Sequence, residues 1–287
     1  MRRLLFLAAF FLMGAAQAQD AHPALWTAHG PKGSVTLVAS LHLLPPGTKW
    51  HNPAIDKAMV GADTFVFEVA TGAGERDEAT RFILDKGLLP RGQTLNAMLD
   101  DEASKRDYRR ALSMAGMEAG NLDQKRPWLA EVVLTVQAMY RRNYSADHTP
   151  EGEAHLFAQT RGKDIRYLDT TRQQLEFLAG ADPSPGVTQL KTVLADFPNQ
   201  AAREQRFVDA WAGGDVDRTA ALIAAGLNDL PEESRRLQER NHDWTRQIES
   251  MLNEDRNFFV VVGVAHLAGP QGVPALLRAH GYKVDGP

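Results

Sequence analysis

Two histidines and one glutamate are the side chains of this 287-residue chain whose positions best suit chemistry. His42 and His266 each come two residues after an apolar, β-branched run, and Glu68 lies inside a third run of that kind. Ligands of open α/β sheets bind at the carboxyl ends of strands, so the three side chains are expected to converge on one edge of a sheet. The chain has no cysteine, so any metal would have to be held by His, Asp, Glu or water.

Each of these residues also has an interpretation without chemistry. A glutamate among Phe and Val is costly to desolvate unless a cation or hydrogen-bond donors meet it, so Glu68 could belong to a structural ion pair or face solvent. A lone histidine near a strand end is commonly hydrogen-bonded or exposed. His42 and His266 stand out by their matched settings, V-A-S-L-H-L and V-G-V-A-H-L, which carry a small residue, Ala39 or Gly263, three positions before the histidine.

A further polar residue is expected on the buried face of a helix over residues 232–252. Apolar or amide side chains recur there at intervals of four, three, four and three, at Leu237, Asn241, Trp244, Ile248 and Met251. This spacing is one helical face, so Asn241 is predicted to face the core, where an amide needs partners. Arg240 could reach the same edge of the helix. The alternative is an asparagine that only satisfies the backbone of a loop.

The elements that must position these residues predict an α/β fold. Strands are expected at residues 25–28, 35–40, 64–69, 165–168, 258–264 and 282–284, and residues 75–140 and 187–252 are expected to be mainly helical. The run 258–264 is almost continuously apolar, which is typical of a strand covered on both faces. The sequence therefore predicts a mixed central sheet flanked by helices, with a mainly helical insert in the middle of the chain.

Residues 1–18 have the pattern of a secretory signal peptide. Two arginines precede an apolar run from Leu4 to Met13, and Ala16-Gln17-Ala18 gives the small-x-small cleavage pattern. The run is too short to span a bilayer, which argues against the alternative of a membrane anchor. We expect residues 19–287 to form one periplasmic or secreted domain without an integral membrane segment.

The charge balance argues against a nucleic-acid partner. The whole chain has 32 basic and 36 acidic residues, and loss of the two arginines near its start would leave a net charge of −6. Phosphate neutralisation needs clustered Lys and Arg, and the sequence has no evident cluster of that kind.

Together these residues resemble the TraB/PrgY/GumN family, which includes the Tiki metalloproteases and is related in fold to erythromycin esterase-like and ChaN-like proteins. The family has two G-x-x-H motifs, one near each end, and a glutamate at the end of the second strand. Gly263–His266 and Phe67-Glu68 match, whereas the first motif here begins at Ala39. Further similarities over residues 25–284 are Pro127-Trp128, Leu168-Asp169-Thr170, Gln174-Leu175 and Arg240-Asn241.

The resemblance implies an exported, peptidase-like, metal-dependent hydrolase. The implied metal ligands are His42, Glu68, His266 and Asp169, and the implied catalytic residues are Glu68, His266, Arg240 and Asn241, with Asp169, Arg240 and Asn241 in the outer part of the site. A Mn, Co, Zn or Fe ion on such ligands would acidify bound water and polarise a carbonyl. Glu68 could accept the water's proton, and Arg240 could hold a substrate carboxylate.

Two departures from the family pattern leave alternatives open. Ala39 stands for glycine, so its methyl group is either tolerated or alters activity, and Asp169 is one methylene shorter than the family's glutamate. The expected partner is a peptide or small-molecule substrate. The alternative function is a non-catalytic periplasmic protein that binds or sequesters a peptide or other small ligand. A role beside envelope or polysaccharide enzymes is implied only by the name GumN.

Overall fold

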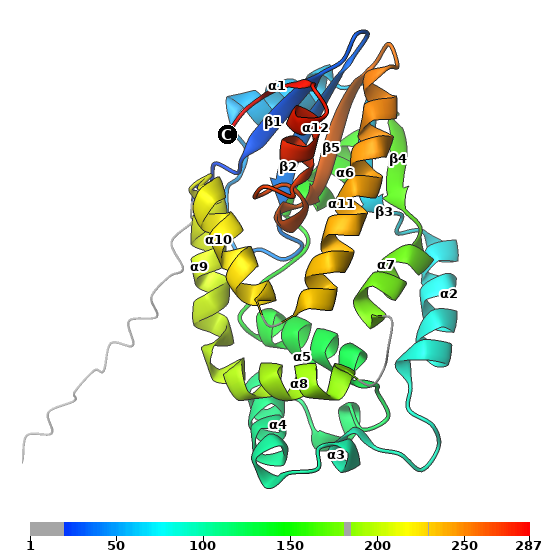
Figure 1. The fold of residues 1–287 in the computed structure, drawn as a ribbon, viewed down its shortest axis with the longest axis vertical. Helices are drawn as coiled ribbons and strands as arrows, with labels where there is room; N and C mark the ends of the chain where they lie inside the picture. The colour runs from blue at the N-terminus through cyan, green and yellow to red at the C-terminus, as the bar shows by residue number, and fades with distance from the viewer. Residues whose placement is uncertain (1–19, 181–184, 229) are drawn as a thin grey trace, which may run out of the picture.

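A six-stranded sheet of order β4-β3-β5-β2-β1-β6 forms the centre of the molecule (Figure 1). The computed structural model describes residues 20–180, 185–228 and 230–287. The strands are β1 (Leu25–His29), β2 (Ser34–Ser40), β3 (Thr64–Val69), β4 (Asp164–Asp169), β5 (Asn257–Gly263) and β6 (Lys283–Asp285). Neighbours from β4 to β2 pair in parallel, whereas β1 pairs antiparallel with β2 and β6. The predicted mixed sheet is confirmed, with strand ends shifted by one residue at most.

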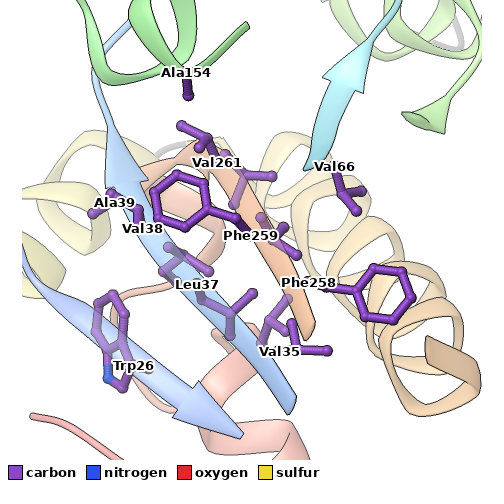
Figure 2. Packing of buried hydrophobic residues seen from close by; sticks show 14 of the residues in the cluster. Trp26, Val35, Leu37, Val38, Ala39, Val66, Ala154, Phe258, Phe259 and Val261 are labelled. Atoms are coloured by element: carbon purple, nitrogen blue, oxygen red, sulfur yellow. The ribbon is translucent and has the colours of Figure 1, made fainter. Parts of the chain in front are cut away.

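The apolar strand β5 is the central one because it pairs with β2 on one side and β3 on the other. Its side chains alternate between two helical layers. Phe258 points toward α11 (Pro231–Leu252), and Val261 points toward Ala154 of α6 (Pro150–Thr160) (Figure 2). Both faces of the strand are thus covered, which accounts for its unbroken apolar sequence.

The predicted helical insert is present and has an apolar core of its own. The remaining α-helices are α1 (Pro53–Gly61), α2 (Ala73–Phe82), α3 (Leu95–Met98), α4 (Glu102–Ala115), α5 (Pro127–Arg141), α7 (Thr171–Ala179), α8 (Pro185–Asp196), α9 (Gln200–Ala212), α10 (Val216–Leu227) and α12 (Val273–Ala279). One buried cluster packs around the sheet, and a second joins α3, α4, α5 and α8 through Leu95, Leu112, Leu134 and Leu190. Figure 1 shows this second group of helices beyond the end of the sheet at which β2, β3 and β5 finish.

Local sequence signals set several helix starts. The Asn52 side chain accepts hydrogen bonds from the backbone N–H groups of Ala54 and Ile55, as expected for the cap of α1. Pro127 is the first residue of α5, where its missing N–H costs nothing.

Two predictions concern export and membranes. The predicted signal peptide, residues 1–18, lies outside the described residues. Within the part of the chain that the structure describes, no helix is both long and apolar enough to span a bilayer.

Candidate functional site

His42, Glu68 and His266 meet at the carboxyl edge of the sheet, beside Gly263 at the end of β5. The Nε2 atom of His42 lies 4.0 Å from Oε1 of Glu68, and the Gly263 backbone N–H donates to the same oxygen at 2.7 Å. A methyl group added at Gly263 would lie 3.2 Å from Glu68 Oε1, 3.5 Å from His42 Nε2 and 3.9 Å from His266 Cδ2. The three side chains, called the edge cluster below, therefore surround one small space.

His42 is held from the α6 side of the sheet. Its ring is 59% exposed, and its Nδ1 lies 3.0 Å from Oε2 of Glu151, in the first turn of α6. The hydrogen bond to Glu151 is the main cause that raises the pKa of His42 to about 9, and the charges of Glu68 and Glu151 add to it, while burial and Arg240 act in the opposite direction. At neutral pH and without a bound cation, this ring is an imidazolium.

His266 is held from the α11 side and is buried. Its Nδ1 lies 2.6 Å from Oδ1 of Asn241, and the Asn241 amide nitrogen donates to the Gln271 carbonyl at 2.8 Å. Burial lowers the pKa of His266 well below its usual value, and the charge of Arg240 adds to this effect. The ring is therefore neutral. Because an amide oxygen can only accept, the proton is on Nδ1 and the lone pair is on Nε2.

Glu68 is the buried carboxylate of the edge cluster, with 3% of its surface exposed. One oxygen accepts from the Gly263 N–H, and Oε2 lies 3.6 Å from Nη2 of Arg240. A donor and a cation thus compensate its desolvation. Glu68 thus has the cation that a structural ion pair requires, and the two histidines lie beside the same carboxylate.

Arg240 and Asp169 form a buried pair behind the edge cluster. The Arg240 Nε donates to Asp169 Oδ2 at 2.6 Å, its Nη2 donates to Gln174, and its guanidinium lies between the rings of Phe177 and Trp244. The Trp244 indole N–H donates to the other Asp169 oxygen at 3.0 Å. Both oxygens of Asp169 are thus engaged away from the edge cluster. These contacts favour Asp169 as a support for Arg240 over a metal ligand, and they leave Arg240 poorly placed to clamp a substrate carboxylate.

The donor chemistry of the edge cluster fits a divalent ion. Two ligands of one ion lie at most about 4.2 Å apart, twice a bond of about 2.1 Å, and His42 Nε2 and Glu68 Oε1 are 4.0 Å apart. Both imidazoles have Nδ1 against an acceptor, as ligating histidines commonly do. Over residues 20–180, 185–228 and 230–287, no three His, Asp or Glu side chains are already gathered at metal-binding distances. His42, Glu68 and His266 fit an ion by chemistry, but the cluster is not closed around one.

The alanine of the first motif lies in the core. Ala39 is fully buried and pairs with Val262, while Ser40 pairs with Gly263. Side chains alternate along a strand, so the Ala39 methyl group is on the opposite face of the sheet from the open side of Gly263. The Ala39 carbonyl also accepts a hydrogen bond from the Trp211 indole at 3.0 Å. The methyl group is accommodated as a packed core atom.

Sequence reasoning missed Glu151, the partner of His42. In the sequence it follows Thr149 and Pro150, which read as the cap and first residue of a helix, and an acidic residue in a first turn is common for its effect on the helix dipole. The only available signal was the expectation that an exposed ligating histidine needs a hydrogen-bond partner for its second nitrogen.

Of three comparisons with known proteins, one finds a match. A model of the TraB/PrgY/gumN family matches residues 24–286, which include every strand and the whole edge cluster. Neither the curated proteins nor the solved structures provide a match. By the extent of the family match, the chain belongs to the TraB/PrgY/gumN family.

Proposed function

We propose that this protein is an exported metal-dependent hydrolase, with a peptide or another carbonyl compound as substrate, whose divalent ion is held by His42, Glu68 and His266. The observation that carries the proposal is the pair of imidazoles from opposite ends of the chain, each with Nδ1 against an acceptor, beside one buried carboxylate. Export is supported by the signal-peptide pattern of residues 1–18.

The two histidines of the edge cluster differ in protonation, and this difference would decide how readily each one binds the ion. His266 presents an unprotonated Nε2, which can hold a cation without first losing a proton. His42 must release a proton to do the same, so binding of an ion is expected to be weaker at low pH. When bound, the ion would polarise the substrate carbonyl and acidify a water molecule.

Glu68 is placed to receive the proton of a nucleophile at the edge cluster. Its negative charge is compensated by the Gly263 N–H and the Arg240 guanidinium, and its Oε1 faces His42 Nε2 across 4.0 Å. Asn241 holds the His266 ring. Arg240, itself held by Asp169, pairs with the Glu68 carboxylate from behind. The same arrangement also suits Glu68 as a ligand.

Metal binding by the purified protein tests the proposal. Calorimetry with Mn²⁺, Co²⁺ and Zn²⁺ should show one equivalent in the wild type and a loss of at least about tenfold in affinity in His42→Ala and His266→Gln. His280→Ala is the matched control, because His280 also has its Nδ1 against a carboxylate, that of Glu249, but lies away from the edge cluster. Its affinity should equal that of the wild type.

Hydrolysis then separates an enzyme from a binding protein. The metal-loaded wild type should cleave members of a peptide library, and Glu68→Gln should not. A wild type that takes up no ion under any loading condition contradicts the proposal. A protein that retains peptides without metal and never cleaves them is instead the non-catalytic binding protein.

A further inference from the structure

We propose that Glu151 is the positioning residue of His42, holding its ring so that Nε2 faces Glu68. The proposal rests on the proposed function, because it gives His42 a role at the edge cluster. The contact that carries it joins His42 Nδ1 to Glu151 Oε2 at 3.0 Å. Glu151 lies in α6, the helix before β4, and is 109 residues away from His42 in the chain.

His42 depends on this contact more than His266 depends on its own. The His42 ring is 59% exposed and lies beyond the last residue of β2, so packing does little to fix it. Its distance of 4.0 Å to Glu68 is too long for a hydrogen bond. Among the described residues, Glu151 is the hydrogen-bond partner of the ring. Loss of Glu151 would therefore free the ring to leave the edge cluster.

The helix that carries Glu151 is well fixed, as the base of a positioning group must be. Thr149 caps α6 by accepting from the Gly152 N–H at 3.1 Å, and Pro150 occupies the first helical position. Ala154 and Ala158 bury the same helix against the sheet. A carboxylate in the first turn is also favoured by the helix dipole. The helix thus presents a charged acceptor from a rigid element.

The two histidine partners come from opposite layers of the fold. Glu151 belongs to α6 on one face of the sheet, and Asn241 belongs to α11 on the other. Each takes the Nδ1 atom of its histidine. Outer partners of this kind typically contribute about 10- to 100-fold to metal affinity. Glu151 therefore does for the exposed histidine what Asn241 does for the buried one.

The same helical turn offers a matched control. Glu153, two residues further on, contacts His51 Nε2 at 2.8 Å and His148 Nδ1 at 3.0 Å. His51 lies in the same loop as His42, residues 41–52 between β2 and α1, so Glu153 fastens this loop without touching the His42 ring. A substitution at Glu153 thus reports what a looser loop does by itself.

The experiment compares Glu151→Ala, Glu151→Gln and Glu153→Ala by two readouts. Calorimetry with Zn²⁺ at pH 7.5 should show a 10- to 100-fold loss in Glu151→Ala, and Glu151→Gln should recover most of it because an amide oxygen can accept the Nδ1 proton. NMR titration of the metal-free protein should move the His42 pKa from about 9 toward 6.5 in both Glu151 variants. Glu153→Ala should leave both readouts at wild-type values.

Three results would contradict either the positioning role of Glu151 or the proposed function, and they can be told apart. If Glu151→Ala keeps wild-type affinity and pKa while His42→Ala abolishes binding, Glu151 does not position His42 and the proposed function stands. If Glu153→Ala loses as much affinity as Glu151→Ala, the effect belongs to the loop and the positioning role is overturned. If the wild type binds no metal, the proposed function fails, and the NMR titration still decides whether Glu151 holds His42.

Discussion

The side-chain oxygen of Asn241 lies 2.6 Å from Nδ1 of His266, and its amide nitrogen is engaged by the backbone carbonyl of Gln271 at 2.8 Å. The second bond fixes the orientation of the amide and thereby makes its oxygen the partner of the ring. This one residue thus serves both interpretations of a core-facing asparagine, since it satisfies a loop backbone and selects the tautomer of a buried histidine.

Replacement of Asn241 by leucine should affect both stability and metal binding. It keeps the approximate size of the side chain but leaves the His266 Nδ1–H and the Gln271 carbonyl without their partner. We expect unfolding in urea to show a loss of about 1–3 kcal/mol, with metal affinity reduced about 10- to 100-fold. Asn253→Ala, at the exposed end of α11, should change neither, and equal effects in the two variants would contradict a specific role for Asn241.

Removal of one partner from the buried pair of Arg240 and Asp169 should destabilise the folded protein strongly. Both side chains are 8% exposed, so Arg240→Met leaves the Asp169 carboxylate buried without its cation, at a cost of about 3–5 kcal/mol in the free energy of unfolding. Arg235→Met on the same helix removes an exposed arginine paired with Glu232 and Glu239, and is expected to cost under about 1 kcal/mol. Denaturant unfolding of both variants measures the difference. Similar losses would show that burial of the pair is unimportant.

Gly263→Ala should weaken metal binding with little loss of stability. The added methyl group would lie 3.2 Å from Glu68 Oε1 and 3.5 Å from His42 Nε2, in the space that the edge cluster surrounds. Gly226→Ala in α10 meets nothing within 4 Å and should stabilise the helix by up to about 1 kcal/mol. Calorimetry with Zn²⁺ and urea unfolding test both variants. Undiminished affinity in Gly263→Ala would show that an ion, if bound, lies elsewhere.

The metal-free protein should lose stability as the pH falls from 7 to 5. The pKa of His266 is lowered in the folded state, so below about pH 6.5 the unfolded chain binds a proton that the folded chain does not, at a cost of up to about 1.4 kcal/mol per pH unit. Urea unfolding in EDTA should show a smaller fall for His266→Gln than for the wild type. Equal slopes would mean that His266 is charged in the folded state.

His42 has the opposite dependence in the same experiment. Its pKa is raised to about 9 in the folded state, so its contribution is complete below about pH 6.5 and is lost as the pH rises through 9. This contribution is small because the ring is mostly exposed.

The strands and the edge cluster could be predicted because they rest on local patterns. Apolar, β-branched runs marked the strands, and their carboxyl ends placed His42 and His266 in one region. Helical spacing identified Asn241 as core-facing, which its 1% exposure confirms. In each case the signal lay within one turn or one strand of the residue concerned.

The contacts of Glu151 and Asp169 could not be predicted, because their partners are distant in the sequence. Glu151 looks like any acidic residue of a helical first turn until His42 is brought beside it. The position of Asp169 at the end of β4 gives no sign that Arg240 and Trp244 contact both of its oxygens. Spacing along the chain contains no information on which of two carboxylates faces the histidines.

The order of the strands also dictates when the molecule can fold. β5 begins at Asn257 and lies between β2 and β3. The β1–β2 pair and the β3–β4 pair therefore cannot join into one sheet until the chain has been synthesised almost to its end. Contacts of such long sequence separation form slowly. A growing or truncated chain that stops before Asn257 would hold two apolar strand edges open, and would be a target for proteases and aggregation before it could hold any substrate.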